Sequence, residues 1–187
     1  MARNPLPFRI QSQECTEWCW ASVVSSVAVF VNSTQQPAQC EVLDREAFSP
    51  NDPSPGCCQA GNRCNRDGTN NVCNRTGSIG RALQDYGLTQ DPGAHTPSLS
   101  DFVTIRQQID MCCVVVFELV DRVHPQVAHV MVVTGYAGTD TLSIVDPAVA
   151  GALYSYSYSV LLNLVPVEGD LSSWRLKAFY KTVPGQC

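Results

Sequence analysis

One cysteine of this chain stands where its thiol could act as a nucleophile. Cys19 lies where a polar loop passes into an apolar segment that is predicted to be a helix. The exposed N–H groups and the dipole of a helix N-terminus stabilise a thiolate, which is the reactive form of cysteine. Trp18 and Trp20 flank Cys19 and would shield it from bulk water. The competing interpretation is a structural cysteine buried between two core tryptophans.

A glutamine lies close enough in the sequence to assist such a cysteine. Gln13 stands six positions before Cys19. Its side-chain amide could join the backbone N–H of Cys19 in binding the oxyanion that forms when a thiolate attacks a carbonyl. The two residues together therefore indicate acyl-transfer chemistry.

A nucleophilic cysteine needs a general base, and the chain offers three histidines. His95 and His124 stand in loop-like stretches beside Pro or Gly, where a solvated histidine is the ordinary case. His129 instead opens the apolar run 130–136, which reads as a buried strand. A titratable residue at the mouth of such a strand can reach a cleft, so His129 is the candidate base. A hydrogen-bonded core histidine is the alternative.

The base in turn needs a group that orients its ring. Asp146 ends the next apolar stretch, 141–146, and a turn is predicted at 137–140. If the two strands pair as a hairpin, His129 and Asp146 come to the same end of it. The alternative for Asp146 is a simple strand stop before Pro147.

The elements that must position these residues divide into helices first and strands second. This order predicts an α+β fold, in which a helical lobe packs against an antiparallel sheet. We expect one domain, 1–187, with a mainly helical and irregular lobe at 1–110, a cysteine-rich insert at 40–73, and a β lobe at 111–187. The predicted helices are 19–31, 78–86 with Gly87 as its stop, and one after Pro97 capped by Ser98 or Ser100; the predicted strands are 112–119, 128–136, 141–146, 153–158 and 174–181.

Ten cysteines indicate an oxidised protein. They stand at 15, 19, 40, 57, 58, 64, 73, 112, 113 and 187, and so many favour disulfides. If Cys19 is free for chemistry, nine remain, so at least one more is unpaired in the monomer. Cys112 and Cys113 lie in an apolar run and are the expected buried thiols. Zinc held by Cys57, Cys58, Cys64 and Cys73 is the alternative use of the insert, although zinc sites favour closer Cys pairs.

Charge and hydropathy narrow the classes of partner. The net charge is −5 and no basic stripe is present, which argues against nucleic acid. No apolar run approaches the roughly 20 residues that cross a membrane. The first thirteen residues lack the apolar core of a signal peptide. We therefore expect either a cytosolic protein or a domain cut from an exported chain.

The combined motifs resemble the bacterial papain-like cysteine peptidases, in particular the C39-like and C70 branch, which holds plant-pathogen effectors. The resemblance rests on Gln13, the Cys19-Trp-Ala-Ser run, the His129-Val-Met-Val-Val-Thr-Gly-Tyr run and Val145-Asp146-Pro147, in the order Cys, His, Asp. It spans roughly residues 8–165. It implies a papain-like fold with an active site in the cleft between the lobes.

The resemblance also implies roles and partners. Cys19 would be the nucleophile, His129 the base, Asp146 its orienter and Gln13 the oxyanion glutamine of an endopeptidase that uses no cofactor or metal. A protein or peptide would be the substrate of a monomeric enzyme delivered as an effector or toxin domain and restrained by a cognate inhibitor. A catalytically silent binding module, and a deamidase or acyltransferase on the same fold, are the alternatives.

Overall fold

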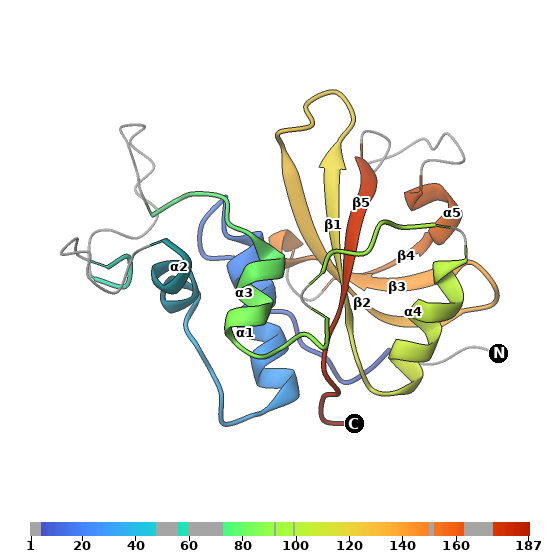
Figure 1. Cartoon of the computed structure of the whole chain (residues 1–187), viewed down its shortest axis with the longest axis horizontal. Helices are drawn as coiled ribbons and strands as arrows, with labels where there is room; N and C mark the ends of the chain where they lie inside the picture. Colours follow the sequence, from blue (N-terminus) through green and yellow to red (C-terminus); the bar gives the residue numbers. More distant parts are fainter. Residues whose placement is uncertain are drawn as a thin grey trace.

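The computed structural model describes residues 5–47, 56–59, 73–91, 93–98, 100–149, 152–162 and 174–187. Within them the fold is α+β, as predicted, with helices gathered beside one antiparallel sheet (Figure 1). The helices are α1 (Cys19–Val31), α2 (Gln39–Ala47), α3 (Ile79–Asp85), α4 (Asp101–Asp110), the 3-10 turn η1 (Pro147–Val149) and α5 (Tyr158–Leu161). The strands are β1 (Val115–Asp121), β2 (Ala128–Ala137), β3 (Thr141–Val145), β4 (Leu153–Ser157) and β5 (Trp174–Lys181).

Helix α1 is the buried centre of the helical side. Its residues are apolar on nearly every face, and eleven of its thirteen side chains are buried. Valine is a mediocre helix former, so burial rather than intrinsic propensity stabilises this helix. It packs against β2 on one side and against α2 and α3 on others, whereas α4 lies on the sheet side of the molecule (Figure 1). The predicted helix 19–31 is confirmed.

The sheet has the strand order β4-β3-β2-β1-β5, and every neighbouring pair is antiparallel. β2 and β3 form the predicted hairpin, and Gly138 supplies the turn with a positive φ of 59°. A left-handed backbone of this kind suits glycine. The register places Val132 opposite Val145, so His129 and Asp146 lie toward the same end of the hairpin.

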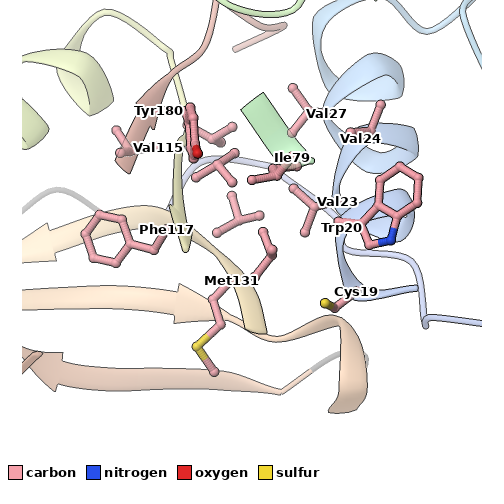
Figure 2. Close-up of a cluster of buried hydrophobic side chains, with 14 of the residues drawn as sticks. Cys19, Trp20, Val23, Val24, Val27, Ile79, Val115, Phe117, Met131 and Tyr180 are labelled. Carbon is pink, nitrogen blue, oxygen red and sulfur yellow. The ribbon is translucent and has the colours of Figure 1, made fainter. Parts of the chain in front are cut away.

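Helices and sheet share one hydrophobic core. Figure 2 shows the α1 side chains Val23 and Val27 facing Ile79 of α3 and residues of the sheet, including Val115, whereas Val24 lies on the other side of the helix with Trp20. Buried apolar residues from the segment before α1 through β5 belong to this single cluster. The helix that carries Cys19 and the strand that carries His129 are therefore fixed to one another by continuous packing, which gives these residues a rigid base.

Two helices were missed by the sequence analysis. None of the predicted helices covers Gln39–Ala47, which forms α2, or Tyr158–Leu161, which forms the single turn α5. Val42 and Leu43 of α2 are buried, and the helix packs against α1. Its polar remainder gave little helical signal, because tertiary packing rather than propensity stabilises such short helices.

The other predicted helix ends agree with the structure more closely. Ser78 caps α3 by accepting a hydrogen bond from the Arg81 N–H at 3.4 Å, and Gly87 follows the helix with a φ of 66°. Ser100 is the N-cap residue of α4 but makes no capping side-chain bond. The Asp101 carboxylate instead accepts from the Ser98 N–H at 2.7 Å.

The cysteines are largely oxidised, as predicted. Disulfides join Cys40 to Cys58, Cys57 to Cys73 and Cys112 to Cys187, and Cys15 is disulfide-bonded as well. The free thiols among the described residues are Cys19 and Cys113, both buried.

The prediction of a buried thiol is therefore confirmed for Cys113 and wrong for Cys112. The Gly185 N–H donates to the Cys112 carbonyl at 2.8 Å, which brings the C-terminal tail alongside Cys112. This pairing could not be foreseen from an apolar run. Since Cys57, Cys58 and Cys73 are in disulfides, they offer no thiolates for zinc; Cys64 lies outside the described residues.

No helix within the described ranges is both long and apolar enough to span a bilayer.

Candidate active site

Cys19 is the first residue of α1, and its thiol is free. Figure 2 shows its sulfur at the end of the helix, turned toward the sheet. The preceding residue, Trp18, makes no side-chain capping bond, so the N–H groups of the first turn remain available to a negative charge. Only 8% of the Cys19 surface is exposed. Cys19 is thus largely buried but keeps some contact with solvent.

The loop before Cys19 is fixed by the segment around Cys73. The indole N–H of Trp18 donates to the Cys73 carbonyl at 2.6 Å, and that of Trp20 donates to the Arg75 carbonyl at 3.2 Å. Cys73 is in turn covalently joined to Cys57. The two tryptophans on either side of Cys19 are therefore anchored to a disulfide-bonded segment. This anchoring supports a well-defined position for the Cys19 backbone.

His129 and Asp146 meet as the hairpin predicts. His129 Nε2 lies 2.8 Å from Asp146 Oδ1, and the two side chains are only 18% and 13% exposed. The Ala148 N–H also donates to Asp146 Oδ1 at 2.7 Å, which fixes the carboxylate. Because Nε2 is used by Asp146, Nδ1 is the ring nitrogen left for Cys19. A base with an oriented ring is the arrangement that nucleophilic catalysis needs.

The surroundings of His129 favour its protonated form. Burial would lower the pKa of the ring, but hydrogen bonds to Asp146 and to Cys19, with the negative charges of both groups, outweigh it and raise the pKa from 6.5 to about 9. The imidazolium therefore persists across the neutral range. Such a ring can hold the proton of Cys19 and donate it to a leaving group.

Gln13 lies beside this pair. It lines the same cavity as His129 and Asp146. Its N–H donates to the Pro147 carbonyl at 2.9 Å, which ties the glutamine loop to the turn that carries Asp146. The side-chain Nε2 donates to the Thr16 carbonyl at 2.9 Å, which leaves one amide hydrogen for another acceptor.

A buried glutamine on α2 fixes the residues on both sides of Gln13. Gln39 is 2% exposed. Its Nε2 donates to the Ser12 carbonyl at 2.7 Å, and its Oε1 accepts from the Glu14 N–H at 3.0 Å. The missed helix α2 therefore contributes directly to the site, because it positions the loop that presents the oxyanion candidate.

Trp174, at the start of β5, is a site residue that the sequence analysis did not identify. Its ring centroid lies 6.0 Å from that of His129, at a tilt of 57°, and it lines the cavity beside the His129–Asp146 pair. An aromatic ring there limits access of water to the hydrogen bond between them. The sequence gave only the alternation of a half-exposed strand, which says nothing about a neighbour 45 positions earlier.

The other two histidines lie elsewhere. His95 stacks on Phe179 with a centroid distance of 5.0 Å, and His124 is 64% exposed beside Asp121. Neither lines the cavities next to Cys19 and His129. Of the three histidines, His129 is the one that is brought to Cys19.

No family model and no curated protein match the chain.

Proposed function

We propose that this protein is a papain-like cysteine endopeptidase in which Cys19, His129 and Asp146 act as nucleophile, base and orienting carboxylate. One observation carries the proposal. A free cysteine at a helix N-terminus lies near enough to His129 to raise the pKa of its ring, and His129 Nε2 lies 2.8 Å from a fixed carboxylate. A structural cysteine needs neither a charged partner nor an oriented histidine.

The first half of the reaction forms an acyl-enzyme. The Cys19 thiolate attacks the peptide carbonyl, and the carbonyl oxygen becomes an oxyanion. When the C–N bond breaks, the His129 imidazolium gives its proton to the leaving nitrogen. The Asp146 carboxylate holds the ring in place and stabilises its charged form throughout.

The second half regenerates the enzyme. His129, now neutral, takes a proton from water, and the hydroxide oxygen attacks the thioester carbonyl. The C–S bond breaks, the acid product leaves, and the thiolate–imidazolium pair returns. Gln13 Nε2 and the Cys19 N–H bind the oxyanion in both halves, since donors fixed before the reaction need no reorganisation as charge develops.

The substrate class that fits is a protein or peptide. The cavity beside His129 and Asp146 has a volume of about 430 Å³ and opens at the surface. Four disulfide-bonded half-cystines near the nucleophile, at 40, 57, 58 and 73, favour action in an oxidising setting. We accordingly propose an exported or delivered domain, such as an effector or toxin, with a separate inhibitor protein as its partner.

Cleavage of a denatured protein such as casein tests the proposal. New N-termini should appear with the wild-type protein and disappear in Cys19→Ala and His129→Ala. Two matched variants, Cys113→Ala at the other free thiol and His124→Ala at an exposed histidine, should retain activity. If no protein or peptide is cleaved by the wild type, the peptidase proposal is wrong. Conversion of glutamine to glutamate, or transfer to an added amine, would indicate the deamidase or acyltransferase alternative.

A further inference from the structure

Two cavities of very different size lie on either side of the reacting pair. The larger, of about 430 Å³, is lined by His129 and Met131. The smaller, of about 30 Å³, is lined by Cys19 and Val130. Because side chains alternate along a strand, His129 and Met131 face one side of β2 and Val130 the other. The site is therefore asymmetric about this strand.

The chemistry assigns each cavity to one half of the substrate. In the proposed reaction the acyl group is bonded to Cys19, whereas the leaving amine receives its proton from His129. The substrate residues that follow the scissile bond therefore extend past His129 into the larger cavity. Residues before it extend past Cys19 along the smaller pocket. This assignment rests on the proposed function.

The larger cavity has an aromatic wall. Tyr154 and Tyr156 of β4 stack with their centroids 5.8 Å apart at an angle of 23°, and both line the cavity together with Trp174. Val127 and Val149 at its rim are 47% and 51% exposed. Its volume is in the range of pockets that enclose a drug-sized group. An aromatic or large aliphatic side chain would bury apolar surface there.

The smaller pocket can hold far less. About 30 Å³ is the volume that one molecule occupies in liquid water. The Trp20 indole forms part of its wall, and Gly77 packs so closely that an added Cβ would lie 2.5 Å from that ring. The pocket therefore cannot provide selectivity for large side chains without rearrangement of a buried tryptophan.

We propose that the site selects its substrate on the leaving-group side, through an aromatic or large aliphatic residue directly after the scissile bond, bound against Tyr154 and Tyr156. Burial of one large apolar side chain supplies roughly ten- to hundredfold selectivity over alanine. Gln13, Thr16 and Glu17 supply polar side chains to the lining of the same cavity.

Competition between added amines and water for the acyl-enzyme tests this selectivity separately from the acylation step. A small acyl ester, such as a glycine ester blocked at its amine, acylates Cys19. Added amino-acid amides then compete with water for the thioester. The α-amino nitrogen of the amino-acid amide attacks the thioester carbonyl. The C–S bond breaks, Cys19 leaves as a thiolate, and the proton lost from the amine passes to His129. The ratio of peptide product to acid measures binding of the incoming residue alone.

The expected result is that phenylalanine amide, tryptophan amide and leucine amide capture the acyl group roughly ten- to hundredfold better than alanine amide. In a Tyr154→Ala/Tyr156→Ala variant this preference, read as the ratio of peptide product to acid, should fall by about tenfold. The matched control is Leu153→Ala on the same edge strand, since Leu153 is 53% exposed and does not line the cavity.

Two contrary outcomes are distinguishable. If the ester is hydrolysed but all amides capture the acyl group equally, or the double variant keeps the aromatic preference, this selectivity is refuted and the peptidase proposal stands. If no ester acylates Cys19 at all, the proposed function fails and the selectivity fails with it.

Discussion

Replacement of Asp146 by asparagine isolates the electrostatic part of the site. Asn is nearly the same shape as Asp, so Asp146→Asn keeps the packing but removes the negative charge 2.8 Å from His129 Nε2. The hydrogen bond to Asp146 is the foremost of the effects that hold the pKa of His129 at about 9 against burial. Loss of an opposite charge at this distance lowers a pKa by roughly one to three units.

The consequence for catalysis follows from the loss of the imidazolium. In the wild type, kcat/KM should fall on the alkaline side with an apparent pKa of about 9. In Asp146→Asn this limb should move to roughly pH 6–8. If the shift is two units, only about one quarter of His129 remains protonated at pH 7.5.

The free energy of unfolding should also depend on the protonation of His129. The folded pKa of His129 is raised above its unfolded value, so its contribution is fully present below about pH 6.5 and is lost as the pH rises through about 9. The difference of these two values corresponds to about 3 kcal/mol of unfolding free energy in the wild type. Asp146→Asn should show a flatter dependence across that window.

The assay is a pH series of kcat/KM, with NMR titration of the labelled His129 ring and urea unfolding on the same samples. The matched control is Asp91→Asn, which removes a carboxylate 3.3 Å from His95, a histidine outside the site. An alkaline limb that stays near pH 9 in Asp146→Asn, or that moves equally in Asp91→Asn, would refute the reasoning.

Three further outcomes are expected. Gln13→Ala should lower kcat roughly 10²–10³-fold in steady-state assays while KM changes little, because it removes an oxyanion donor; a loss below threefold would count against that role. The double variant Cys57→Ser/Cys73→Ser opens a loop of 16 residues and should cost about 3 kcal/mol of unfolding free energy by urea titration, with slower alkylation of the active thiol; unchanged values in both measurements would contradict the anchoring role. Gly77→Ala should force the Trp20 ring to move at a cost of about 1–3 kcal/mol, read by denaturation and tryptophan fluorescence, and an unshifted midpoint would be inconsistent with the close contact.

The parts of the site that the sequence predicted depend on local patterns. The start of α1 at Cys19 follows from an apolar run after a polar loop. The meeting of His129 with Asp146 follows from strand alternation and one turn around Gly138. Each of these inferences spans few residues. In a hairpin, the position of the turn determines which residues of the two strands pair.

The parts that were missed depend on contacts between distant segments. Cys112 pairs with Cys187, 75 positions away, although its apolar neighbours resemble those of the free Cys113. Trp174 reaches His129 only because β5 returns to pair with β1. Helix α2 is short and largely polar, and the hydrogen bonds of Gln39 reach residues 25 and 27 positions earlier, so Gln39 could not be recognised as the residue that fixes the loop of Gln13.

The most direct test of the central claim is the rate of alkylation at Cys19 near pH 7, followed by intact mass and peptide mapping after addition of iodoacetamide or E-64. Cys113 is an internal reference, because it is also free and buried and its burial raises the pKa of its thiol. We predict rapid single addition at Cys19, abolished in Cys19→Ala, slowed strongly in His129→Ala, and little addition at Cys113. Labelling of Cys19 as slow as that of Cys113, or unaffected by His129→Ala, would contradict an activated thiolate–imidazolium pair.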